Sequence, residues 1–165
     1  MKTLIIYYYN KKNIRIVAET LAKELECYIC EVKDLRNRKG FKNRVNESID
    51  AFRESKTEIY PPSLDLEEYG LIYFGTPTLS NNPSPAIITM IDRCDLRGKD
   101  VILFATMASS GGESAIKTME EKIKYRGGRV IESFTLETKG MEEEDVIRST
   151  ESLISTLDLK MYSAY

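Results

Sequence analysis

The 165-residue chain contains no histidine. This absence excludes Ser-His-Asp and Cys-His catalytic arrangements, histidine-based metal sites and a proton shuttle through imidazole. Any chemistry at a site of this protein must therefore come from carboxylates, lysine, tyrosine or backbone dipoles, or from a bound cofactor.

Several other features are scarce. With 24 basic and 26 acidic residues, the net charge of −2 gives no global electrostatic reason to expect a nucleic-acid or anionic-membrane partner. No uncharged apolar run approaches the ~18 residues that a membrane-spanning helix needs. The apolar stretch Leu4–Tyr9 is also shorter than the core of a signal peptide. Three cysteines, an odd number, fit a reducing compartment, and we expect a cytoplasmic protein without a membrane partner.

Two of the cysteines, Cys27 and Cys30, form a C-x-x-C pair. If Cys30 lies in a strand, residues three apart point to opposite faces of the sheet. A redox dithiol normally lies at a helix N-terminus, and a zinc site would need further ligands. We therefore expect structural cysteines and no metal site.

The chain has the composition of a globular domain, with 42 % hydrophobic and 30 % charged residues, and its length predicts one domain over residues 1–165. Buried-type strands alternate with amphipathic helices. The predicted helices cover Asn13–Leu25, Ala86–Arg93 with Ser84 as N-cap and Pro85 as first residue, the stretch after Glu113 as far as Gly127, and the face from Val146 to Leu157. The predicted strands are Thr3–Tyr8, Tyr28–Val32, Leu71–Phe74, Val101–Ala105 and Arg129–Leu136.

The stretch Asp34–Tyr69 is less regular. It holds the basic run Arg36–Arg44, and a weak helical stripe at Val45, Ile49 and Phe52 predicts one helix between two loops. Such runs are usually solvated, although this one also has the charge to dock an acidic electron-transfer partner or to hold an anion at the rim of a site.

Strands that alternate with helices predict a parallel sheet covered on both faces, a three-layer, doubly wound α/β domain. Ligands bind such sheets beyond the carboxyl ends of the strands. The loops Tyr9–Asn13, Thr76–Asn82 and Thr106–Glu113 are therefore the candidate site.

These loops lie in the segments LIIYYYNKKNIRIVAETLAKEL, YFGTPTLSNNPSPAIITMID and VILFATMASSGGESAIKTMEEKI. In this order and spacing the chain resembles the flavodoxin family. The resemblance implies a five-stranded parallel sheet of order 2-1-3-4-5 and the cofactor flavin mononucleotide (FMN). It also implies that the first loop holds the phosphate and that the other two flank the flavin ring.

The resemblance assigns cofactor-binding roles by position, and none of the residues concerned is expected to be catalytic. The phosphate site would be formed by Tyr9, Asn10, Lys11, Lys12, Asn13 and Ile14. The ring pocket would be formed by Thr76, Pro77, Thr78, Leu79, Asn81, Asn82, Thr106, Met107, Ala108, Ser109, Ser110, Gly111 and Gly112.

The chain departs from the family pattern in all three loops, and the third loop, like the second, lacks the aromatic residue that some relatives use. Hydroxyl residues and a glycine are replaced in the first loop, where a helix N-terminus and two lysines supply the attraction for phosphate instead. In the second loop Leu79 stands where many relatives have an aromatic residue. No glycine lies between Gly75 and Gly98, so Asn81 or Asn82 would have to adopt the left-handed conformation that a flipping peptide needs.

The resemblance implies a flavin-bearing electron carrier that meets redox partner proteins transiently. Two alternatives stay open. One is an FMN-dependent reductase that uses NAD(P)H to reduce quinones or other small acceptors. The other is a flavodoxin-like module that has lost FMN and acts through protein contacts. The oligomeric state is open as well.

Overall fold

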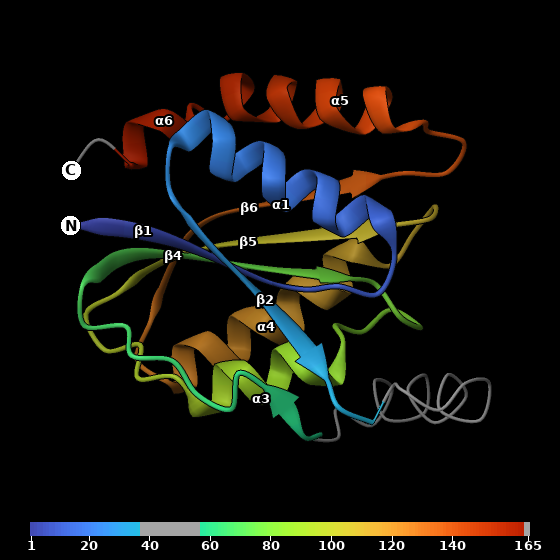
Figure 1. The fold of residues 1–165 in the computed structure, drawn as a ribbon. Coiled ribbons are helices and arrows are strands. Elements are labelled where there is room, and N and C mark those ends of the chain that lie inside the picture. The colour runs from blue at the N-terminus through green and yellow to red at the C-terminus, as the bar shows by residue number, and fades with distance from the viewer. Residues whose placement is uncertain (37–56, 164–165) are drawn as a thin grey trace.

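The computed structural model describes residues 1–36 and 57–163 (Figure 1). The predicted helix around Val45, Ile49 and Phe52, and residues 37–44 of the basic run, lie outside the described residues. The strands are β1 (Lys2–Tyr8), β2 (Tyr28–Asp34), β3 (Ile59–Tyr60), β4 (Tyr69–Pro77), β5 (Asp100–Met107) and β6 (Arg129–Glu137). The helices are α1 (Lys12–Leu25), α3 (Pro85–Arg93), α4 (Gly112–Tyr125), α5 (Glu143–Thr156) and α6 (Leu159–Tyr162).

In the described part of the chain, the strands form one sheet of order β3-β2-β1-β4-β5-β6. The five long strands are parallel and have the order that the resemblance implies. The sixth strand, β3, was not predicted, and it pairs with the end of β2 in the antiparallel sense. A two-residue strand is too short to show a periodic pattern. Long-range bonds fix it, among them the one that the Thr57 hydroxyl donates to Asp34 Oδ1 at 2.9 Å.

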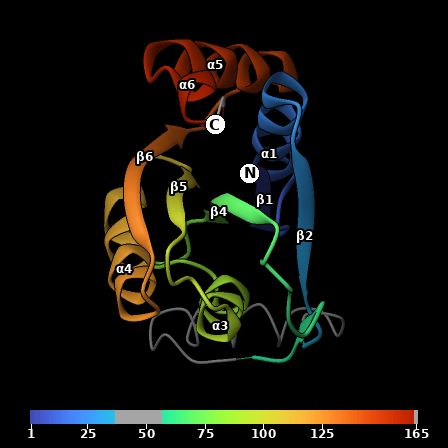
Figure 2. The same ribbon diagram turned by 90° about the vertical axis from the view of Figure 1, so that its left-hand side faces the viewer.

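Helices cover both faces of the sheet. Helices α1, α5 and α6 lie on one face, and α3 and α4 lie on the other (Figures 1 and 2). Each face has its own apolar core: Ile14, Leu21 and Val146 lie in the first, and Ile87 and Met119 lie in the second. The strands between these cores are buried on both sides, which is why their sequences are continuous apolar runs.

Strand β4 extends beyond the predicted Leu71–Phe74 and includes Gly75, Thr76 and Pro77. Gly75 pairs with Phe104, and a Cβ atom at position 75 would collide with the Phe104 ring. The glycine thus marks a close approach within a strand rather than the end of one.

Helix ends follow the local signals in the sequence. The Ser84 hydroxyl accepts a hydrogen bond from the Ile87 N–H at 3.3 Å, with Pro85 as the first helical residue. Helix α5 starts with a capping box, in which the Glu142 N–H donates to Asp145 Oδ2 at 2.9 Å. Helix α6 was not predicted, because one turn of helix is too short to show a stripe.

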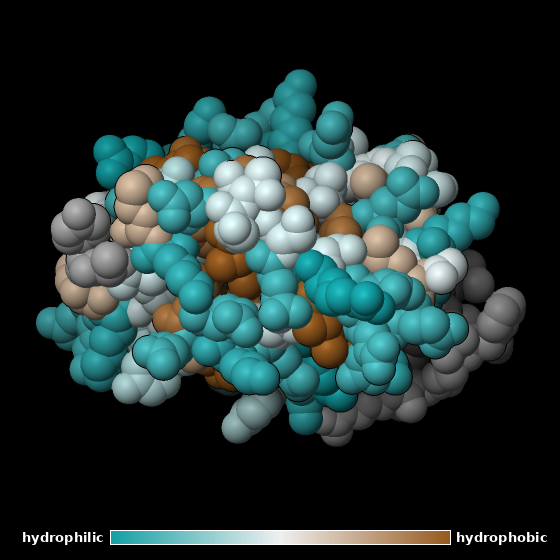
Figure 3. Space-filling view, turned by 90° about the horizontal axis from the view of Figure 1, so that it is seen from above, coloured by the Kyte–Doolittle hydropathy of each residue, from teal (hydrophilic) through white to brown (hydrophobic). Residues whose placement is uncertain are grey.

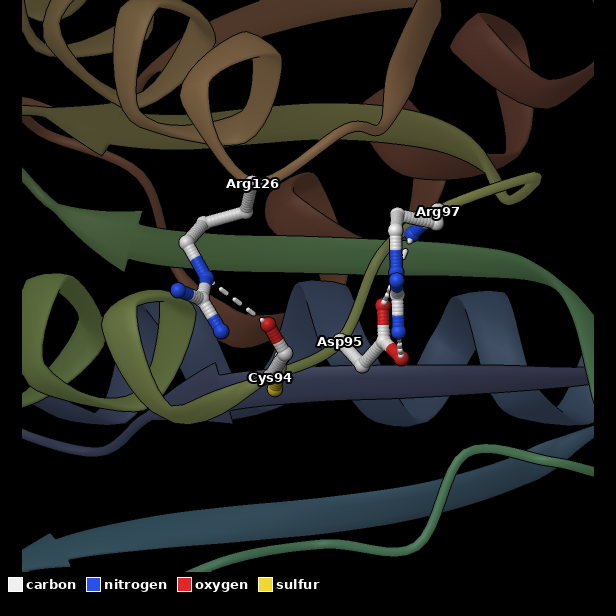
Figure 4. A network of polar contacts seen from close by, with 4 residues as sticks. All are labelled: Cys94, Asp95, Arg97 and Arg126. Atoms are coloured by element: carbon white, nitrogen blue, oxygen red, sulfur yellow. Dashed lines mark hydrogen bonds and ion pairs between the residues drawn. The ribbon is translucent and has the colours of Figure 1, made fainter.

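The C-terminal ends of α3 and α4 meet near the amino ends of the strands (Figure 4). Arg126 Nε donates to the Cys94 carbonyl at 3.0 Å and so caps α3. Arg97 Nη2 lies 2.7 Å from Asp95 Oδ2. Hydrogen bonds from the Arg97 side chain and backbone hold the pKa of the Asp95 carboxyl well below its usual range.

Cys27 and Cys30 pack against the cores on opposite faces of the sheet, as their spacing predicts. Both are free thiols, like the buried Cys94. Tyr7, Tyr8 and Tyr73 are core residues, also as predicted.

The face formed by α1 and α5 is mainly hydrophilic, with hydrophobic side chains showing between the helices (Figure 3). None of the helices within residues 1–36 and 57–163 is long and apolar enough to cross a membrane.

Candidate functional site

A cavity of about 260 Å³ opens at the carboxyl edge of the sheet. Parallel strands end there with their loops side by side, which is why this edge holds ligands in doubly wound sheets. The loops after β1, β4, β5 and β6 all contribute to the cavity. Its lining residues are Asn10, Lys11, Asn13, Pro77, Thr78, Leu79, Thr106, Met107, Ala108, Thr138 and Lys139.

The N-terminus of α1 forms one wall of the cavity. Among the described residues, no side chain caps this helix, and its first turn contains no acidic residue. The first N–H groups of a helix have no partner within the helix, so they carry a partial positive charge. Asn10, Lys11 and Asn13 line the cavity at this wall, which therefore favours an anion.

Three predicted residues of the first loop do not line the cavity. The Ile14 side chain is buried in the core under α1. Lys12 Nζ lies 3.1 Å from Glu143 Oε2, in an exposed ion pair. The Tyr9 ring lies under the guanidinium of Arg15, with 3.7 Å between the guanidinium carbon and the ring centroid. The ion pair of Lys12 and the cation–π contact of Tyr9 thus occupy two side chains that the resemblance assigned to the phosphate.

The segment after β4 forms a tight turn. Leu79 and Asn82 exchange two backbone hydrogen bonds of 2.8 Å each. Between them Ser80 has φ 47° and Asn81 has φ 66°. Asn81 therefore adopts the left-handed conformation expected of it or of Asn82, and Ser80 does so too. Pro77, Thr78 and Leu79 line the cavity, whereas Asn81 and Asn82 do not.

Two threonines of this segment have different environments. The buried Thr76 hydroxyl donates to the Pro77 carbonyl at 2.8 Å and accepts from the Ser84 N–H at 2.9 Å, so it supports the loop from within. The Thr78 backbone N–H donates to the Thr106 carbonyl at 2.9 Å. The Thr78 hydroxyl is buried at the cavity and has no hydrogen-bond partner among the described residues. Buried hydroxyls normally have partners, so within this part of the chain the Thr78 hydroxyl is an exception, as is the buried Tyr73 hydroxyl, which does not line the cavity.

The loop after β5 packs against that turn. Gly111 has φ 92°, and a Cβ atom there would collide with the Asn81 side chain. Gly112 N–H donates to Met107 Sδ at 3.4 Å. Thr106, Met107 and Ala108 line the cavity. The remaining predicted residues of this loop, Ser109, Ser110, Gly111 and Gly112, do not.

The loop after β6 completes the cavity and was not among the predicted site segments. The backbone N–H and the hydroxyl of Thr138 both donate to the Met107 carbonyl, at 2.9 and 3.2 Å. The Lys139 N–H donates to the Ala108 carbonyl at 3.2 Å. The carboxyl-edge rule would have found this loop, since it follows the last predicted strand, but no residue motif draws attention to it.

The cavity combines two chemical environments. Lys11 and Lys139 are its charged lining residues among those described, and both are cations. Pro77, Leu79 and Met107 give it an apolar wall. The arrangement suits a ligand with a flat apolar part and an anionic group.

Comparison with known proteins assigns the chain to one family. The model of the flavodoxin family matches residues 2–145 of the chain. No curated protein matches the chain.

Solved structures resemble the chain over most of its length. A crystal structure from Bacteroides uniformis has 25 % sequence identity and a TM-score of 0.72, covering 91 % of this chain and 97 % of that one. A flavoprotein from Lactobacillus acidophilus, solved in complex with FMN, has 25 % identity and a TM-score of 0.69, covering 83 % of this chain and 93 % of that one. Oxidised flavodoxin 1 from Bacillus cereus has 18 % identity and a TM-score of 0.55, covering 94 % and 98 %.

Proposed function

The chain belongs to the flavodoxin family, and we propose that it binds FMN in the carboxyl-edge cavity and serves as an electron carrier. One observation carries the proposal: the uncapped N-terminus of α1 and an apolar wall of Pro77, Leu79 and Met107 meet in one cavity. FMN has a phosphate for the first feature and an isoalloxazine ring for the second.

Each wall of the cavity fits one part of FMN. The N–H groups of the first turn of α1, with Asn10, Lys11 and Asn13, would hold the phosphate. Pro77, Thr78 and Leu79 would contact the ring from one side, and Thr106–Ala108 from another. Met107 supports this assignment, because a contact between its sulfur atom and the flavin ring would be mildly favourable.

The size of the cavity bears on how the ligand would be exposed. Its volume of about 260 Å³ is below the roughly 300–1,000 Å³ of pockets that enclose a drug-sized ligand. We therefore expect part of bound FMN to remain at the surface. An exposed ring edge suits electron exchange during a brief encounter, and we infer transient redox partner proteins that meet this edge.

The bound flavin would accept and donate the electrons, and the protein would position it and set its potential. The cavity-lining residues that the structure describes include no carboxylate to act as a general acid or base.

The experiment is a titration of the purified protein with FMN, followed by flavin fluorescence and by the visible spectrum. We expect quenching at micromolar protein and a shifted flavin absorption band. If FMN fluorescence is not quenched, both the carrier and the reductase hypotheses are wrong, and the module that acts through protein contacts is the remaining alternative. Turnover of NAD(P)H with a quinone by the pure holoprotein would favour the reductase.

A further inference from the structure

Two lysines from loops 128 positions apart in the sequence line the same cavity: Lys11 follows β1 and Lys139 follows β6. The resemblance to the flavodoxin family assigned Lys11 and Lys12 to the phosphate site. In the structure Lys12 pairs with Glu143 at 3.1 Å and does not line the cavity. Within residues 1–36 and 57–163, the second cation that lines the cavity is therefore Lys139.

The loop of Lys139 lies beside the N-terminus of α1. Helices α1 and α5 pack side by side on one face of the sheet. The Lys12–Glu143 ion pair joins the first residue of α1 to the first residue of α5. Lys139 precedes Glu143 by four residues, so the Cα atoms of these two residues lie within about 14 Å of each other. The Lys139 loop and the N-terminus of α1 line the same cavity, so a ligand in it can reach both.

The backbone of this loop is held in place by hydrogen bonds. Both Thr138 donors bind the Met107 carbonyl, and the Lys139 N–H binds the Ala108 carbonyl. The Met141 N–H donates back to the Thr138 carbonyl at 3.0 Å. The exposed Lys139 side chain therefore extends from an anchored backbone, and less entropy is lost when it contacts a ligand.

We propose that Lys139 and Lys11 form a two-loop clamp for the phosphate of FMN. The clamp takes the place of the hydroxyl residues that the first loop lacks. This inference rests on the proposed function, because it assigns the residues that recognise one group of the same ligand. Two mobile cations are point charges that attract a phosphate dianion without fixing its geometry, so the clamp selects for charge.

The test compares FMN with riboflavin, which has the same ring and no phosphate. The Lys139→Gln variant should bind FMN about 5- to 20-fold more weakly, between the effect of an exposed ion pair and that of a charge-assisted hydrogen bond. Its affinity for riboflavin should stay within about twofold of the wild type. Added salt should weaken FMN binding less in this variant than in the wild type, because one screened attraction is gone.

Two further variants sharpen the comparison. Lys11→Gln should show the same selective loss, and the double variant should lose more than either single one. Lys160→Gln is the charge-matched control, since Lys160 lies in α6 at the opposite end of the molecule, and it should bind FMN like the wild type.

The outcomes separate the two proposals. If Lys139→Gln weakens FMN and riboflavin equally, or leaves both unchanged, the clamp is wrong while FMN binding stands. If the wild-type protein binds neither flavin, the proposed function itself is wrong, and the clamp with it.

Discussion

The Thr76 hydroxyl joins the end of β4 to the start of α3, and replacing it with valine tests how much this link stabilises the fold. Valine keeps the volume and branching of threonine but neither donates to the Pro77 carbonyl nor accepts from the Ser84 N–H. Both Thr76 and Ser84 are fully buried, so no water replaces the lost partners. A buried polar group left without a partner costs about 1–3 kcal/mol.

We therefore expect Thr76→Val to lower the free energy of unfolding by about 2 kcal/mol. In a chain of this size that corresponds to a fall in Tm of roughly 4–8 °C. Urea denaturation followed by circular dichroism measures the change. Thr76→Ser is the matched control, because it retains the hydroxyl and loses one methyl group, about 0.8 kcal/mol. A valine variant that is as stable as the wild type, or more stable than the serine variant, would refute the reasoning.

Three further predictions concern stability. Gly111→Ala should lower the free energy of unfolding by about 2–3 kcal/mol and weaken FMN binding. Gly98→Ala should lower it by only the roughly 1 kcal/mol of a positive φ, because an added Cβ at Gly98 meets no atom within 4 Å. Thermal melts and flavin titration compare the two, and equal losses would contradict the prediction. Burial raises the pKa of Cys27 to about 11 and that of Cys94 to about 12, above the ordinary value of 9.0. Thiols in the unfolded chain keep the ordinary pKa and ionise at lower pH than the buried thiols. The free energy of unfolding should therefore be at its maximum below pH 9 and fall above it, by about 1.4 kcal/mol per thiol at pH 10. A pH series of urea melts without this fall would contradict the prediction. Ser84→Ala should cost about 1 kcal/mol through loss of the α3 cap, and a urea melt identical to that of the wild type would count against it.

The parallel fold was predictable because its signals are local. The strand Thr3–Tyr8 lies in the interior of the sheet and reads as an apolar run, and Ser84 followed by Pro85 marks a helix start without reference to the rest of the chain. The strand β3 and the turn of helix α6 escaped prediction, since each is shorter than the period that would reveal it.

The candidate site was predictable by segment and less so by residue. The carboxyl-edge rule located the three loops, but the direction of each side chain depends on distant partners. Lys12 turns to Glu143, and Thr76 turns inward to Ser84. Lys139 was missed for a different reason: its loop follows the last predicted strand at the same edge of the sheet, but no residue motif marks it.

The cavity has a thermodynamic consequence for the whole chain. Its walls begin at Asn10 and end at Lys139, so a molecule held there contacts segments from both ends of the sequence. Local opening of any one wall would release the ligand. By mass action, ligand at 100 times its dissociation constant would then stabilise the native state by about 2.7 kcal/mol, and this gain would protect the first and last loops of the site alike against opening.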